Sequence, residues 1–276
     1  MGSTTGIGPM LALLASTLMA GEVAAGPCPS PGRMAEAADS FRAGLFATFF
    51  EEVSSDRDLL CFFRAVGAKA EDRPAFAALG RALSERSAEA EGTRSLELLE
   101  AAELAFRRGL DRRGRGAAEE DLIENLLLQI TEYDRWHLWG EVDRRAKTKA
   151  RGEGSAAEAA RWAEVVASLE ALRPRAESYP GERPPRHDGD VKKPTRLSAP
   201  QPSPTSRARA AGVEGSVVVQ AVIDERGQVT HTRVIRGLPL GLSEAAVEAI
   251  SQWRFQPATL DGEPVAVYYN LTVSFR

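Results

Sequence analysis

The chain has 276 residues, enough for one or two domains, and 43% of them are hydrophobic, so a packed core can form. Its formal net charge is −4, which excludes a general nucleic-acid-binding protein, because such proteins present a basic surface to phosphates. The two cysteines and three histidines do not stand at metal-site spacing, so we expect no metal and no cofactor.

Residues 1–25 have the layout of an export signal. The run from Ile7 to Ala25 is mostly apolar and small, and Val23-Ala24-Ala25 resembles a cleavage site. No lysine or arginine precedes this run, and Gly21 and Glu22 interrupt it, so it falls short of a clean membrane span. A cleaved signal peptide is the first interpretation, and a retained membrane anchor is the alternative.

The two cysteines, Cys28 and Cys61, follow this leader. In an exported protein they could form a disulfide, because the periplasm and other exported compartments are oxidising. Two unpaired cysteines remain the alternative.

Residues 33–173 predict an all-helical domain. Apolar residues recur there at helical spacings, which gives each segment one apolar face. The segments are Phe41–Phe50, Leu59–Val66, Phe76–Leu83, Leu96–Leu110, Leu122–Trp139 and Trp162–Leu169. Short polar breaks between them favour antiparallel neighbours, so we expect a helical bundle or a helical-repeat-like array.

This helical stretch carries no recognisable chemistry. His137 has no second ligand at metal spacing and is predicted to be a packed histidine. The basic run Arg144–Arg151 is predicted to be a solvated helix end, with an acidic partner or an anionic lipid surface as the alternative.

Residues 174–204 predict a linker. Prolines recur along a polar stretch that has too few apolar side chains to offset its ordering entropy. Such a segment would be extended and would span on the order of 90 Å. It would separate two modules.

Residues 205–276 predict a small α+β module. Val217–Ile223 and Val229–Ile235 alternate like strands on either side of a turn at Gly227. Ser243–Trp253 reads as a helix, and Val265–Phe275 alternates strictly as a last strand. The order β-β-α-β predicts an antiparallel three-stranded sheet with one helix, joined by the proline-rich linker to the all-α domain.

The span from Gln201 to Arg276 resembles the C-terminal domain of the TonB family of periplasmic energy transducers. The matching residues are scattered but keep their order. They are Gln201-Pro202, Ala208-Arg209, Gly212-Val213-Glu214-Gly215, Val217-Val218-Val219, Ile223-Asp224, Gly227, Val229, Ala245-Ala246, Trp253-Arg254-Phe255, Pro257-Ala258, Asp261-Gly262, Pro264-Val265, Val273 and Phe275.

The resemblance implies a periplasmic binding module and not an enzyme. Domains of this family bind a short peptide of an outer-membrane TonB-dependent receptor, which adds a strand beside the last strand of the sheet. The residues expected at this site are Gln201, Pro202, Val265, Val267, Tyr269, Leu271 and Val273. The resemblance also implies coupling to an inner-membrane motor of the ExbB–ExbD type. The sequence does not say which alternate residues of the last strand turn their N–H groups to the edge.

Two other interpretations remain open. One is a periplasmic scaffold or adaptor without energy transduction, whose helical domain recruits a partner protein. The other is a homodimer formed through an exposed strand edge. An enzyme is not expected, because the chain has no Ser-His-Asp constellation, phosphate-binding glycine loop or metal-spaced cluster.

Overall fold

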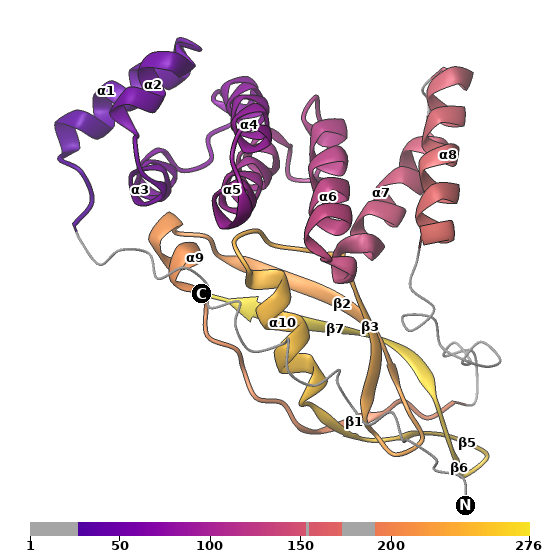
Figure 1. The fold of residues 1–276 in the computed structure, drawn as a ribbon. Helices are drawn as coiled ribbons and strands as arrows, with labels where there is room; N and C mark the ends of the chain where they lie inside the picture. Colours follow the sequence, from indigo (N-terminus) through magenta and orange to yellow (C-terminus); the bar gives the residue numbers. More distant parts are fainter. Residues whose placement is uncertain (1–26, 153–154, 173–190) are drawn as a thin grey trace, which may run out of the picture.

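The computed structural model describes residues 27–152, 155–172 and 191–276. In this part of the chain, helices come first and strands follow, with the row of helices standing on the strand-rich domain (Figure 1). This confirms the predicted helical region followed by a strand-rich region with antiparallel sheets. The predicted leader, residues 1–25, lies outside the described residues.

The helical region has eight α-helices and one short 3-10 helix among its described residues. They are α1 (Pro31–Arg42), α2 (Phe46–Glu52), α3 (Asp56–Val66), α4 (Arg73–Ala88), α5 (Gly92–Gly109), α6 (Glu119–Tyr133), η1 (Trp136–Leu138), α7 (Trp139–Ala150) and α8 (Ala156–Leu172). Side-chain caps define two starts, since Ser30 accepts from the Arg33 N–H at 3.3 Å and Ser55 from the Asp58 N–H at 3.1 Å.

Two segments that the periodicity predicts as continuous are divided. Gly44, at φ 71°, separates α1 from α2. Asp134 closes α6 in the left-handed conformation at φ 55°, so η1 and α7 change direction there. Apolar spacing continues through both turns, which is why the sequence alone does not reveal them.

Phenylalanine rings fill the core at the start of the helical region. The Phe41 ring lies 5.2 Å from that of Phe62 and 4.8 Å from that of Phe76. A disulfide joins Cys28 to Cys61 on α3, with their Cα atoms 5.8 Å apart. The sequence left open whether Cys28 and Cys61 are bonded or unpaired, and in the structure they form a disulfide. Closing a loop of this size stabilises a fold by about 4 kcal/mol in the chain-entropy account.

The C-terminal domain is built on a three-stranded antiparallel sheet of order β3-β2-β7, with β2 (Gly215–Ile223), β3 (Val229–Arg236) and β7 (Val267–Phe275). Helix α10 (Leu242–Ser251) packs on β2 and β3. The β2–β3 turn depends on Gly227, which has φ 74° and accepts a 2.9 Å hydrogen bond from the Phe255 N–H.

The domain has more elements than the sequence predicts. They are β1 (Thr195–Ser198), α9 (Ser206–Ala211), β4 (Arg254–Gln256), β5 (Ala258–Leu260) and β6 (Glu263–Val265). Strand β1 pairs with β4, and β5 pairs with β6. Helix α10 begins at Leu242 after Gly241, so Ser243 is not its N-cap.

Part of the predicted linker belongs to this folded domain. Residues 195–198 form β1, and the Pro200 carbonyl accepts a 3.0 Å hydrogen bond from the indole of the buried Trp253. The local composition has too few apolar residues for a core, but β4 and Trp253 supply partners from elsewhere in the chain. Residues 173–190 lie outside the described part.

Candidate functional site

The candidate site is the free edge of strand β7. All of β7, from Val267 to Phe275, pairs with β2 in one unbroken antiparallel register. Among the described residues no strand pairs with the other side of β7. Its outward N–H and C=O groups are therefore open to an added strand.

The opposite edge of the sheet is covered by the helical region. Helix α7 lies against β3, and Arg144 donates from Nε to the Ile235 carbonyl at 2.9 Å. The Arg233 guanidinium lies over the Trp139 ring at 4.8 Å. A Cβ on Gly140 would come within 2.6 Å of the Val234 carbonyl oxygen, so α7 can lie this close to β3 only because residue 140 has no side chain.

The direction of the backbone groups on β7 follows from the pairing of β2. The Val222 carbonyl accepts from the Thr230 hydroxyl on β3 at 3.4 Å, so this carbonyl points toward β3. Val222 stands opposite Tyr268, and backbone groups alternate along a strand. The outward N–H and C=O groups on β7 are therefore assigned to Tyr268, Asn270, Thr272 and Ser274.

A contact at the far side of the sheet agrees with this assignment. The Val234 carbonyl on β3 faces Gly140 on α7, away from β2. Val234 pairs with Val219, and Val219 pairs with Leu271. Val219 thus turns its backbone groups to β7, and Leu271 bonds inward.

Four of the predicted site residues lie on β7 and face inward. The side chains of Val267, Leu271 and Val273 are buried, and the half-buried Tyr269 ring lies 6.4 Å from that of Phe255. Their side chains hold β7 on the core. The prediction omits Tyr268, Asn270, Thr272 and Ser274, whose backbone groups form the outward edge of β7.

The other three predicted site residues lie on different segments. Val265 ends β6 and pairs with Ala258 on β5, outside the main sheet. Gln201 and Pro202 follow β1, and Gln201 is exposed. The predicted last strand is divided at Ala266 into β6 and β7. The sequence does not reveal this break, because apolar and polar residues alternate strictly through it.

The exposed side chains beside the edge are polar and uncharged. The hydroxyl oxygens of Ser274 and Ser216 are 3.0 Å apart. The side-chain amide of Gln220 donates a 3.5 Å hydrogen bond to the side-chain oxygen of Asn270. No charge on these side chains repels an incoming strand or requires a charged one. Affinity would come from main-chain hydrogen bonds.

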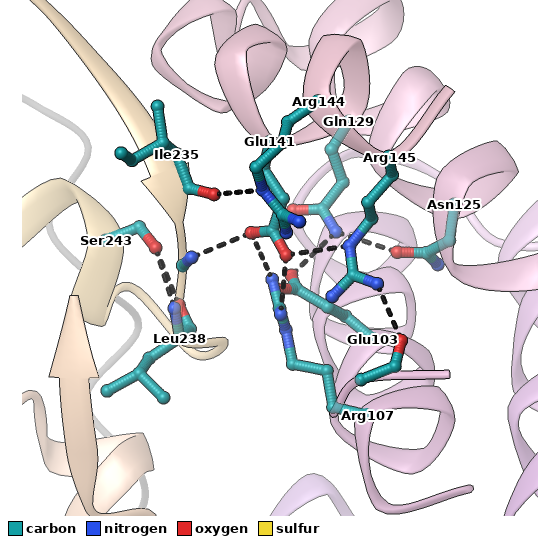
Figure 2. Close-up of polar contacts among 12 residues, drawn as sticks. Glu103, Arg107, Asn125, Gln129, Glu141, Arg144, Arg145, Ile235, Leu238 and Ser243 are labelled. Atoms are coloured by element: carbon teal, nitrogen blue, oxygen red, sulfur yellow. Dashed lines mark hydrogen bonds and ion pairs between the residues drawn. The ribbon is translucent and has the colours of Figure 1, made fainter. Parts of the chain in front are cut away.

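A buried ionic cluster fixes the helical region to the loop after β3 (Figure 2). Glu141 on α7 accepts from Arg107 at 3.0 and 2.9 Å, from Arg145 at 3.0 Å and from the Gly237 N–H at 2.7 Å. Burial by itself would raise the pKa of Glu141, but Arg107, Arg145 and the Gly237 N–H lower it to about 2. Arg145 is thus a buried partner and not part of a solvated helix end, which corrects that prediction.

A second set of ion pairs joins helices α9 and α10 of the C-terminal domain to the helical region. Arg207 on α9 pairs with Asp56 at 2.7 Å and with Glu100. Glu244 on α10 lies 3.0 Å from Arg135 and 3.1 Å from His137. His137 is therefore a packed side chain beside a carboxylate.

The described residues hold no group of three or more histidine, cysteine, aspartate or glutamate side chains that could bind a metal ion. A search of the same residues for a helix long and apolar enough to cross a membrane finds none.

Comparison with known proteins gives matches to the C-terminal part of the chain. Residues 201–276 match the family described as "Gram-negative bacterial TonB protein C-terminal". Protein TonB of Vibrio cholerae serotype O1 is 36% identical over 88 residues, which is 31% of this chain and 36% of that protein. Protein TonB of Yersinia enterocolitica is 42% identical over 84 residues, which is 30% of this chain and 31% of that protein.

Among solved structures, the solution structure of the Pseudomonas aeruginosa TonB C-terminal domain is 26% identical, with a TM-score of 0.27. That match covers 34% of this chain and 93% of the solved domain. This chain spans about a third of the length of the two curated relatives. The family is non-enzymatic, as the sequence predicts for this domain. Residues 201–276 of this chain are therefore a TonB C-terminal domain.

Proposed function

We propose that this chain is a periplasmic TonB-like protein that binds a peptide of an outer-membrane TonB-dependent receptor as an additional strand beside β7. One observation carries the proposal: in the described residues, the sheet of a TonB C-terminal domain has its β3 edge covered by α7, and no strand pairs with its β7 edge. Main-chain groups on β7 would bond the peptide backbone, and Gln201 and Pro202 would contact it from the segment before the domain.

Proline at Asn270 tests the docking edge, because it removes an outward N–H donor without changing a buried side chain. Losing one strand hydrogen bond is expected to weaken binding about fivefold to tenfold. The measurement is isothermal titration calorimetry of the full exported chain with peptides from the periplasmic face of outer-membrane receptors. Asn270→Ala is the matched control, because it also loses the Gln220 contact but keeps the N–H.

Equal affinities for Asn270→Pro and Asn270→Ala would contradict strand addition at this edge. If the unaltered chain bound none of the receptor peptides, receptor docking itself would be rejected. Circular dichroism of both variants checks that the sheet is retained.

Energy transduction is the second step of the proposal. In that role the chain would be anchored in the inner membrane through residues 1–25 and coupled to a proton-driven motor of the ExbB–ExbD type. The test is the mature N-terminus, read by mass spectrometry of the protein from membrane and soluble fractions. An intact leader in the inner membrane supports a transducer.

Cleavage near Ala25 supports the alternative, a periplasmic adaptor whose helical region recruits a partner. The structure offers one observation in favour of this alternative. The helical region is joined to the TonB C-terminal domain by the ion pairs of Arg207 and by the hydrogen bond from the Gly237 N–H to Glu141, so any partner that it binds is held at a fixed position beside the sheet.

Homodimerisation would use the same edge, since two β7 edges could pair. Sedimentation of Asn270→Pro and the unaltered chain tests it, because dimers formed this way should dissociate in the proline variant. Receptor peptide should then compete with the dimer.

A further inference from the structure

An arginine-lined cavity lies between the helical region and the C-terminal domain, away from β7. Its volume is about 480 Å³, within the usual range for small-molecule sites. Residues 107, 110–114 and 144–145 line it from the helical side, and residues 218 and 235–238 line it from the sheet side. Figure 2 shows Arg144 bonded to the Ile235 carbonyl at the end of β3, with Arg107 and Arg145 gathered around Glu141 beside it.

The lining is basic although the whole chain is acidic. Six arginines and one carboxylate, Asp111, line the cavity, whereas the chain has a formal net charge of −4. The Asp111 carboxylate already accepts from the Arg113 and Arg115 N–H groups at 2.8 and 2.9 Å. Its single negative charge offsets at most one of the six arginines that line the cavity.

The arginines fall into two groups. Arg107 and Arg145 share the buried Glu141, and each pairs with one more carboxylate, Glu103 and Glu119 respectively, so these two arginines belong to the structure of the junction. In the part of the chain that the structure describes, Arg112, Arg113 and Arg236 form no ion pair, and each is exposed. The unneutralised positive charge thus lies at the cavity and comes from separate segments.

Arg144 completes this second group. Its Nε–H donates a hydrogen bond to the Ile235 carbonyl, and the Arg144 side chain makes no ion pair within the described residues. Partial burial lowers the pKa of Arg144, and the neighbouring charge of Arg145 lowers it further. An anion in the cavity would offset both effects.

We propose that this cavity binds a small phosphate-bearing anion through Arg112, Arg113, Arg144 and Arg236. Guanidinium groups bind phosphate oxygens in pairs through their planar fork of N–H donors. Four such groups, from the loop after α5, from α7 and from the end of β3, suit an anion with several oxygens on different sides. A single planar carboxylate would use one or two of them.

Binding there would also hold the two regions together, because the ligand would contact residues of both. A ligand that binds only the folded, joined form raises its stability by RT ln(1 + L/Kd), where L is the free ligand concentration, so the stability continues to rise with ligand concentration. The site is separate from the β7 edge, so it can be occupied whether or not a peptide is docked.

Pyrophosphate is the probe, added to the full exported chain at an ionic strength of about 0.15 M. Calorimetry should give saturable one-to-one binding, and the melting temperature should rise with pyrophosphate concentration. The double variant Arg112→Gln, Arg236→Gln should weaken binding about tenfold or more. Both side chains are exposed and form no ion pair among the described residues, so the fold should not depend on them.

The matched control is Arg196→Gln, Arg226→Gln, which removes the same charge from β1 and the β2–β3 turn. It should bind pyrophosphate like the unaltered chain. Absence of saturable binding, or equal weakening in the two double variants, would overturn the proposal. The single variant Arg112→Gln gives an independent second measurement, since it too should weaken binding.

A second arm distinguishes the source of the phosphate. Flotation with vesicles containing phosphatidate tests a lipid headgroup, and competition by pyrophosphate tests whether the same cavity is used. Competed vesicle binding identifies a lipid, and pyrophosphate binding without vesicle binding identifies a soluble anion. If the Arg112→Gln, Arg236→Gln variant bound the vesicles as well as the unaltered chain does, the cavity would not be the lipid-binding site.

Discussion

At the scale of single residues, Gly227 decides whether the β2–β3 turn can close. Its φ is 74°, and a Cβ there would lie 1.7 Å from the Phe255 carbonyl oxygen. Gly227→Ala is expected to lower the free energy of unfolding by about 3 kcal/mol, because left-handed strain and a backbone clash add. Urea denaturation of the variant measures the loss.

Gly262 supplies the matched control, because its φ is 90° but nothing lies within 4 Å of its Cβ position. Gly262→Ala should cost only about 1 kcal/mol, from the backbone conformation alone. Equal losses for the two variants would show that the contact with Phe255 does not matter.

At the scale of elements, the approach of α7 to β3 determines which edge of the sheet remains open. Gly140→Ala would place a methyl group 2.6 Å from the Val234 carbonyl oxygen. Helix α7 must then move away, so we expect lower stability and faster amide hydrogen exchange along β3. Hydrogen exchange read by mass spectrometry checks this.

Gly32→Ala is the control for helix propensity, since Gly32 lies in α1 with nothing within 4 Å. Alanine there should leave stability unchanged or raise it by up to about 1 kcal/mol. If Gly140→Ala behaved in the same way, the close packing of α7 on β3 would not limit the distance between them.

At the scale of the whole molecule, the two regions share one connected core, the ion pairs of Arg207 and the hydrogen bond from the Gly237 N–H to Glu141. The pKa of Glu141 falls from an ordinary 4.5 to about 2 on folding. Its stabilisation is therefore complete above about pH 4.5 and is lost as pH falls through about 2. For this fully buried carboxylate it amounts to about 3 kcal/mol.

Glu141→Gln tests this linkage. At neutral pH it leaves Arg107 and Arg145 less well paired, and we expect a loss of about 3–5 kcal/mol. The difference in unfolding free energy between the variant and the unaltered chain should narrow as pH falls below 4.5. Glu248→Gln, at an exposed position of α10, should show neither effect.

Much of the secondary structure was predictable because it depends on local order. Alternation predicts β2, β3 and β7, and helical spacing predicts most of the helical region. The turns at Gly44 and Asp134 were missed, since apolar spacing continues through them. Strand β1 was missed because its partner β4 lies more than fifty residues away.

For the candidate site, the sequence by itself determined the resemblance to a TonB C-terminal domain, because the matching residues from Gln201 to Phe275 keep their order. Alternation of apolar and polar residues also predicted that a strand ends this domain. Only the tertiary structure decided that α7 covers β3 and that, within residues 27–152, 155–172 and 191–276, no strand covers β7. The tertiary structure also decided that every second residue of β7, including Asn270 but not Leu271, turns its backbone groups outward. The direction of these groups depends on how β2 pairs with β3. The arginine-lined junction between the two regions could not be predicted from the sequence, because Glu141, Arg107 and Gly237 meet only when distant segments pack.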